Sequence, residues 1–187
     1  MGPFFRADAP FRAQGASIAS EETPGARVRI SGRVFDRGNR APIAGAVLDT
    51  WQAAPNGLYE NQDERQPDYN LRGRFRTDEG GGYELTALMP TAYPVPTDGP
   101  VGELLRAAQR PPDRPAHIHF IVSAPGYETL VTQVFVEGDM TLGDDAVFTA
   151  GRNMAGDFKK EGGRFHLAYD FPLGRGISKM PKAPIPA

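Results

Sequence analysis

The stretch that most constrains this chain runs from Arg114 to Phe120 and reads Arg-Pro-Ala-His-Ile-His-Phe, with one apolar residue between two histidines. Residues 121–126 continue as Ile-Val-Ser-Ala-Pro-Gly, a sequence typical of a strand that ends in a turn. Because side chains alternate across a β-strand, His117 and His119 are expected on one face, about 7 Å apart along the strand. Ile118 and Phe120 then point to the other face, where they can fill a core.

Two imidazoles on one face suit a metal ion, but they are equally typical of hydrogen-bonded histidines on a half-exposed strand. A two-histidine site usually gains a carboxylate, as in the facial triad of non-haem Fe(II) oxygenases, and neither Asp nor Glu stands in the expected place on this strand. His166 is a candidate third imidazole, although it alternates with apolar residues and a surface or core position fits it better. The histidines alone therefore leave the choice open.

The rest of the chain predicts an all-β fold, a single-domain β-sandwich with one short helix and long loops. Apolar residues alternate with polar ones in short runs, and 22 Gly and 18 Pro supply frequent turns. We expect an irregular N-terminal arm over 1–26, a sandwich over 27–175 and a proline-rich tail over 176–187. The 187 residues suffice to bury a core without disulfides.

Several elements have definite expected bounds. The helix is expected over 101–108, since Pro100 precedes it and Pro111 and Pro112 follow it. A hairpin is expected to join the His-x-His strand to residues 129–137. Further expected elements are strands over 27–35 and 44–53, a hairpin of 73–77 with 83–89, a helical turn near 144–148 inside a loop over 138–162, and a last strand over 165–171.

Composition excludes several classes of function. The chain has no cysteine, so thiolate zinc sites, iron–sulfur clusters and cysteine nucleophiles are excluded. With a formal net charge of −2 and no long basic block, it is not expected to bind nucleic acid. No apolar run reaches the roughly 18 residues of a membrane span, and no signal peptide is apparent, so we expect a cytoplasmic protein without a membrane partner.

Six tyrosines offer further oxygen ligands. Tyr59 follows the Asn56-Gly57 turn, and Tyr93 stands in a proline-stiffened loop upstream of the predicted helix. By spacing alone, packing with a hydroxyl at the rim explains each of them better than a ligand role.

Four motifs, taken together and in order, resemble the intradiol ring-cleavage dioxygenases, which include catechol, hydroxyquinol and protocatechuate dioxygenases. The opening Gly-Pro-Phe-Phe at residues 2–5 and the strand of Trp51 also look familial. The resemblance covers residues 2 to about 150. Its motifs are Gly57-Leu58-Tyr59, residues 90–102, residues 114–120, and Thr132-Gln133-Val134-Phe135 followed by Glu137-Gly138-Asp139.

The resemblance implies one non-haem Fe(III) per chain, held by Tyr59, Tyr93, His117 and His119, with a further position open for substrate. It implies that Tyr93 also takes a proton from the substrate. Arg114 matches an active-site arginine that stabilises developing negative charge, and Gln133 matches a glutamine that hydrogen-bonds near the iron.

The implied reaction inserts both atoms of O₂ into a catechol-type 1,2-diol, with hydroxyquinol or catechol favoured. The ring opens between the hydroxylated carbons to a muconate-type diacid. The catechol and hydroxyquinol branches usually carry an N-terminal helical domain that serves dimerisation, and this sequence begins almost at the Gly-Pro-Phe motif. The order of any homo-oligomer is therefore left open. Two alternatives remain at this point, a non-catalytic transthyretin-like β-sandwich that binds without chemistry, and a zinc or ferrous site that uses His166.

Overall fold

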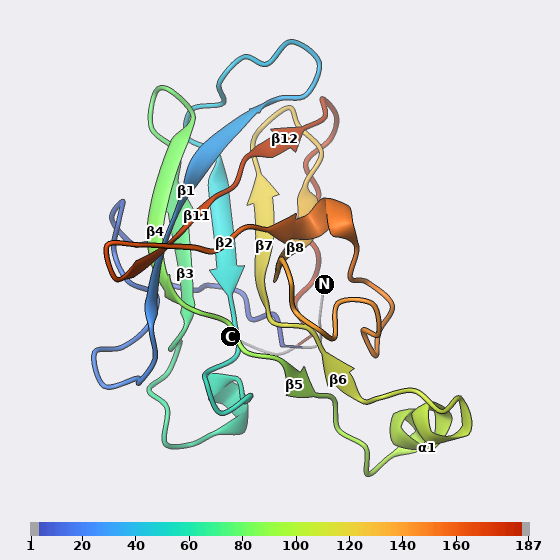
Figure 1. Cartoon of the computed structure of the whole chain (residues 1–187). Helices are drawn as coiled ribbons and strands as arrows, with labels where there is room; N and C mark the ends of the chain where they lie inside the picture. The colour runs from blue at the N-terminus through green and yellow to red at the C-terminus, as the bar shows by residue number, and fades with distance from the viewer. Residues whose placement is uncertain (1–3, 185–187) are drawn as a thin grey trace.

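The computed structural model describes residues 4–184 and shows two five-stranded sheets packed face to face, with a two-stranded ribbon beside them (Figure 1). The all-β sandwich prediction is confirmed. The first sheet has the order β10-β11-β1-β12, and β4 also pairs with β1. Its strands are β1 (Arg27–Asp36), β4 (Gly82–Leu88), β10 (Lys159–Glu161), β11 (Arg164–Ala168) and β12 (Phe171–Leu173).

The second sheet has the order β3-β2-β7-β8-β9 and carries the His-x-His sequence on its central strand. The pairs β2–β7 and β7–β8 are antiparallel, so the predicted hairpin across the Pro125-Gly126 turn is confirmed. Its strands are β2 (Val47–Trp51), β3 (Arg72–Arg76), β7 (His117–Ser123), β8 (Leu130–Val136) and β9 (Ala155–Gly156).

The remaining elements lie at one end of the sandwich or in its loops. The β5–β6 ribbon carries α1 away from the sheets (Figure 1), and α1 begins at Pro100, close to the predicted start. These elements are β5 (Tyr93–Pro94), β6 (Asp113–Arg114), α1 (Pro100–Ala107) and the short 3-10 helices η1 (Glu60–Gln62) and η2 (Arg152–Met154).

The main core lies between the two sheets and is built by alternating residues of both. On β7, Ile118 and Phe120 are fully buried in this core, as the alternation predicts. The opposite sheet contributes Val28 and Ile30 of β1. A smaller cluster covers the outer face of the second sheet and includes Trp51.

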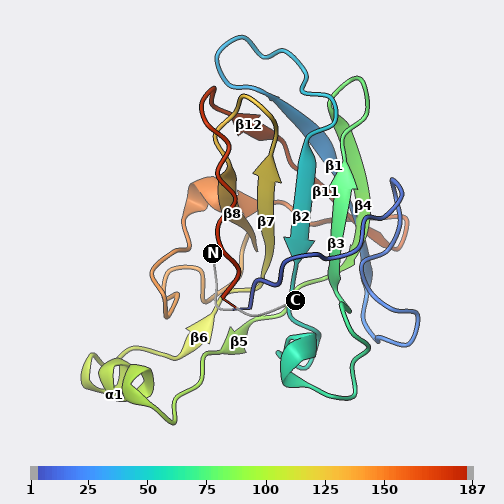
Figure 2. The same cartoon turned by 180° about the vertical axis from the view of Figure 1, so that it is seen from behind.

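Chain segments at both ends cover this outer face of the second sheet (Figure 2). The N-terminal arm crosses β3 and β2, where Arg12 N–H donates to the Arg74 carbonyl and the Phe5 ring lies 5.1 Å from that of Trp51. The C-terminal segment runs beside β8, and Lys179 N–H donates to Thr129 Oγ1. Residues 1–3 of the predicted arm and 185–187 of the predicted tail lie outside the described residues.

The hairpin predicted from 73–77 and 83–89 is wrong. β3 pairs with β2 in one sheet and β4 pairs with β1 in the other, so the glycine-rich turn between them crosses the sandwich. Phe75 of β3 and Leu85 of β4 both point into the core between the sheets, and strands that face each other across a core do not pair edge to edge.

Two further predictions need correction in the C-terminal part. The single strand predicted over 165–171 is split into β11 and β12, because the Asp170 carboxylate accepts the Arg33 N–H that a continuous strand would otherwise bond. The loop predicted over 138–162 contains β9, β10 and η2, and residues 144–148 form turns rather than a helical turn.

Asp49 of β2 is a buried carboxylate outside the main core. It lies opposite Arg74 and Ile121 in the sheet and is 5% exposed, and its carboxylate makes no hydrogen bond or ion pair with any residue between 4 and 184. Burial raises the pKa of Asp49 to about 7, although Arg74 and Arg72 act in the opposite direction. Between about pH 4 and pH 7 the folded protein therefore holds a proton on Asp49 that the unfolded chain has already lost.

We predict that Asp49→Asn stabilises the fold at alkaline pH. The stability linked to neutral Asp49 is complete below about pH 4 and is lost as pH rises through about 7. The stability advantage of the variant should therefore grow by about 3 kcal/mol between pH 5 and 8. Urea unfolding at both pH values measures it. Asp144→Asn removes an exposed carboxylate and is the control. An equal Asp49→Asn effect at both pH values would contradict the prediction.

Candidate metal centre

Strand β7 places both histidines on the outer face of the second sheet. The His119 ring stacks on Trp51 of the neighbouring strand, with centroids 4.6 Å apart and planes 4° apart. His117 and His119 are each 2% exposed, and their Nε2 atoms lie 3.1 Å apart. The alternation predicted from the sequence is confirmed, and it points both ring nitrogens to one spot.

Two separate loops bring Tyr59 and Tyr93 to the same spot. Tyr59 is the residue before η1, and Tyr93 is on β5 opposite Arg114 of β6. Gly57 has a φ of +81°, and a Cβ built there would lie 3.0 Å from the Cβ of Tyr93. Glycine at this position therefore permits both the turn and the close approach of the two loops.

The two phenolic oxygens and the two imidazole nitrogens form a closed ring of contacts. Tyr59 Oη lies 2.9 Å from Tyr93 Oη and 3.2 Å from His119 Nε2. Tyr93 Oη lies 3.4 Å from His117 Nε2, which is the atom 3.1 Å from His119 Nε2. We call these four atoms the donor cluster. Contacts of about 3 Å are the spacing expected between donor atoms that share one metal ion through bonds of about 2 Å.

The electrostatics of the donor cluster suit a cation. Burial raises the pKa of Tyr59 well above its ordinary value and raises that of Tyr93 as well. Burial also lowers the pKa of His117 to about 4 and that of His119 well below its ordinary range. Without a cation the site therefore holds neutral phenols and neutral imidazoles. A bound metal ion would lower the pKa of both phenols and favour their ionised form.

Hydrogen bonds around the cluster fix the tautomer of His117. Its Nδ1–H donates to the Pro115 carbonyl at 2.6 Å, which leaves Nε2 without a hydrogen and with its lone pair directed at the cluster. The Arg114 guanidinium adjoins the same atom, with Nη1 3.1 Å from His117 Nε2. Arg114 Nη2 donates to Gln133 Oε1 at 2.8 Å. The predicted residues Arg114 and Gln133 thus lie together beside the cluster.

A second layer holds the Tyr59 ring. Phe4 stacks on this ring at 4.5 Å, and the Arg72 guanidinium lies 5.9 Å from its centroid. Arg72 Nε in turn donates to both carboxylate oxygens of Glu60 at 2.7 Å, and Arg6 donates to the same carboxylate at 2.8 Å. This buried network gives Tyr59, at 1% exposure, a rigid position.

The donor set decides what kind of ion fits. Between residues 4 and 184, no group of three or more histidine, aspartate and glutamate side chains is close enough to hold a metal ion, so the phenols must complete the set. His166 lies on β11 in the opposite sheet, and a site built from all three histidines does not form. Hard, anionic phenolate oxygens with imidazole suit a highly charged ion such as Fe(III). The residues present fit the ferric site that the family resemblance implies.

Sequence reasoning missed Asp145, whose carboxylate accepts hydrogen bonds from Arg114 Nε and Nη2 at 3.1 and 3.3 Å. Burial alone would raise the pKa of Asp145, but hydrogen bonds from Arg114 and Thr149 lower it to about 2. In the sequence, the only local signal is the acidic pair Asp144-Asp145. The structure distinguishes the two residues, since Asp144 is exposed and Asp145 is 3% exposed. Phe4 and Trp51 were noted in the sequence, but not as walls of the site.

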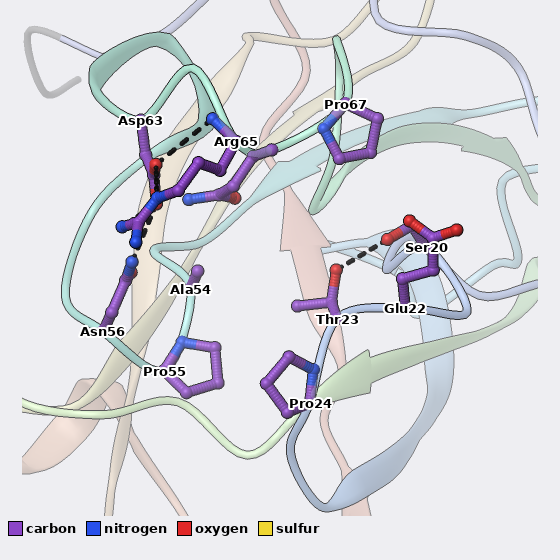
Figure 3. A pocket seen from close by; sticks show the side chains of 11 residues that line it. Ser20, Glu22, Thr23, Pro24, Ala54, Pro55, Asn56, Asp63, Arg65 and Pro67 are labelled. Carbon is purple, nitrogen blue, oxygen red and sulfur yellow. Dashed lines mark hydrogen bonds and ion pairs between the residues drawn. The ribbon is translucent and has the colours of Figure 1, made fainter.

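A cavity of about 360 Å³ lies between the N-terminal arm and the loop of Tyr59 (Figure 3). None of the donor-cluster residues lines it. Its polar side chains pair with one another: Asp63 accepts hydrogen bonds from Asn56 and Arg65, and the Ser20 and Thr23 hydroxyls lie 2.7 Å apart. It is separate from the candidate metal centre.

No helix within the described residues has the length and apolar character to span a membrane.

Comparison with known proteins adds independent evidence. Residues 1–174 match the protein family described as "Dioxygenase". The chain is 47% identical over 161 residues to "Hydroxyquinol 1,2-dioxygenase" of Rhizobium sp. (strain MTP-10005), which covers 86% of this chain and 54% of the relative. It is 40% identical over 162 residues to "Catechol 1,2-dioxygenase" of Candida albicans, which covers 86% of this chain and 53% of the relative. The chain thus spans about half the length of these relatives.

A solved structure agrees in fold. The hydroxyquinol 1,2-dioxygenase of Pseudomonas putida DLL-E4 superposes with a TM-score of 0.87 and 40% sequence identity, over 94% of this chain and 65% of that chain.

We predict that Arg72→Leu destabilises the protein far more than removal of an exposed arginine. Glu60 would keep only its contact with Arg6 in a buried setting, so the free energy of unfolding should fall by about 3 kcal/mol. Arg65→Leu breaks an ion pair in which the arginine side chain is 82% exposed, and should cost less than about 1 kcal/mol. Urea unfolding measures both. Similar losses would contradict the structural role given to the Arg72–Glu60 pair.

Proposed function

Because this chain belongs to the intradiol ring-cleavage dioxygenases, we propose that it holds one non-haem Fe(III) and opens the ring of a catechol-type 1,2-diol. The proposed reaction inserts both atoms of O₂, breaks the bond between the hydroxylated carbons and yields a muconate-type diacid. Tyr59, Tyr93, His117 and His119 are the proposed iron ligands.

The donor cluster is the observation that carries this proposal. Two phenolic oxygens in contact at 2.9 Å within a buried site can both be ionised only beside a strong positive charge. The Arg114 guanidinium supplies one positive charge, and Asp145 largely balances it. A ferric ion held by these four residues would supply the charge that two phenolates require.

The protein residues divide the remaining tasks. When bound, the ferric ion would draw electron density from a chelating diol and make its ring reactive toward O₂. Tyr93 is proposed to accept a proton from the incoming diol at its phenolic oxygen. It suits this role better than Tyr59, because Tyr93 lies on a two-residue strand and is 7% exposed, whereas Tyr59 is clamped and 1% exposed.

Arg114 is proposed to stabilise negative charge as it develops on the substrate. Its Nη1 points toward the cluster from a buried position, where a fixed cation acts more strongly than in water. Gln133 is proposed to hold the other arm of the guanidinium through its side-chain oxygen. Burial of Arg114 and of the donor cluster also keeps bulk water away from the reacting groups.

Hydroxyquinol is the proposed substrate within this class, with catechol next. The relative matched at 47% identity is named for hydroxyquinol and that matched at 40% for catechol. An assembly partner is not proposed, since about half of each relative's length has no counterpart in this chain.

We predict that purified protein contains about one iron per chain and has the red-burgundy colour of tyrosinate bound to Fe(III). His119→Ala removes a proposed ligand and should lose most of the iron. His166→Ala removes the histidine of the opposite sheet and should keep both iron and colour. Metal analysis and visible absorption measure the outcome.

Tyr93→Phe separates two roles of one residue. It should retain much of the iron, through the three remaining ligands, while turnover falls by about 100-fold or more. Wild-type protein that is colourless and takes up no ferric iron would contradict the proposed centre, as would equal iron content in His119→Ala and His166→Ala.

We predict that oxygen uptake is fastest with hydroxyquinol. A mostly apolar pocket separates ligands that differ by one hydroxyl by at most about 100-fold, so kcat/KM for hydroxyquinol should exceed that for catechol by roughly 10-fold to 100-fold. An oxygen electrode measures uptake with hydroxyquinol, catechol, chlorocatechols and protocatechuate. A preference for catechol would contradict the substrate but keep the reaction, whereas no uptake with any diol would contradict the reaction.

A further inference from the structure

The loop between β8 and β9 folds around one carboxylate, that of Asp145. Besides the two contacts from Arg114, Asp145 accepts hydrogen bonds from the backbone N–H groups of Val147, Thr149 and Ala150 at 3.0 to 3.3 Å. The Thr149 hydroxyl adds another at 2.8 Å. All acceptor directions of the carboxylate are thus engaged, and most of them by its own loop.

The backbone of this loop is strained to reach that arrangement. Phe148 has a φ of +58°, a left-handed conformation that is uncommon for a bulky residue. Phe148 is 73% exposed, and its ring contacts the Arg110 guanidinium at 4.2 Å, so burial of the ring in a core does not explain the conformation. The residues on either side of it donate to Asp145, and we therefore assign the turn to the demands of the carboxylate.

The same carboxylate fixes the orientation of Arg114. Arg114 Nε and Nη2 contact Asp145, and Nη2 also contacts Gln133 and Thr149. Only Nη1 remains to face the donor cluster, 3.1 Å from His117 Nε2. A guanidinium is planar and rigid, so anchoring two of its nitrogens fixes the direction of the third.

We propose that Asp145 is a positioning residue that sets the direction of the Arg114 guanidinium. Through this contact, the conformation of the β8–β9 loop affects the rate of the reaction. The inference rests on the proposed function. Without the carboxylate, the guanidinium is free to turn about its long side chain, and its charge no longer lies where negative charge develops. Misplacement of such a group by about 1 Å costs up to about 100-fold in rate.

A double-mutant cycle tests this proposal against a purely structural role. The variants are Asp145→Asn, Arg114→Gln and the double variant, with Asp144→Asn as the control, since Asp144 is exposed and adjacent in sequence. Iron content, resting colour, kcat and KM are measured for each. Asp145→Asn should keep its iron and colour and lose about 10-fold to 100-fold in kcat, with a smaller change in KM.

The double variant gives the decisive result. If Asp145 acts through Arg114, the double variant should be no more than about 3-fold slower than Arg114→Gln alone, because the removed arginine no longer needs a position. Multiplying losses in the double variant would overturn the proposal and indicate independent roles. Full kcat in iron-loaded Asp145→Asn would also overturn it, and so would an equal loss in Asp144→Asn.

Thr149→Val keeps the proposal testable if Asp145→Asn does not fold. Thr149 donates to Asp145 and accepts from Arg114, so its loss should loosen the pair and lower kcat by about 3-fold to 10-fold with iron retained. Wild-type kcat in this variant would then overturn the proposal. An iron-free, inactive wild type would refute the proposed function first, and the positioning role would fall with it. An active wild type with equally active variants would refute the positioning role alone.

Discussion

The two faces of strand β7 perform different tasks, and the rest of the molecule is arranged around that division. The inner face carries Ile118 and Phe120 into the core between the sheets. The outer face carries His117 and His119 into the donor cluster. A shift of the strand by one residue would exchange these faces, so the packing that stabilises the sandwich also fixes the direction of both imidazoles.

Charge balance links the layers of the site to one another. Asp145 and the Arg114 guanidinium form a buried pair beside the cluster, and Glu60 forms another with Arg72 behind Tyr59. Each pair leaves little net charge beside the donor cluster, and burial keeps its tyrosines and histidines neutral in the protein alone. Two phenols and two imidazoles beside balanced ion pairs suit the highly charged ion that we propose for this centre.

How far the sequence predicts this structure depends on the range of the interaction. The alternation in residues 114–120 is local, and it correctly predicts a strand with its histidines on one face. The bounds of α1 are also local, because prolines mark them. The meeting of Tyr59 and Tyr93 with the histidines follows from no spacing, and it was expected only through resemblance to a family.

The errors have the opposite cause, since they depend on contacts between distant residues. The pattern of β3 and β4 is that of a hairpin, and only the shared core shows that they face each other. Asp145 is 31 residues from its partner Arg114, and nothing in its sequence neighbourhood distinguishes it from exposed Asp144. Long-range pairs of this kind require the folded chain before they can be identified.

The parallel pairing of β1 with two late strands affects how the chain folds. β1 is an early segment, and it pairs in parallel with β11 and β12, which are made more than a hundred residues later. During synthesis on the ribosome, β1 can therefore pair with β4 early, but its other edge stays unpaired until β11 and β12 are made. Such distant pairing slows folding and exposes nascent chains to association with one another, so the yield of this protein should depend on growth temperature and on chaperones.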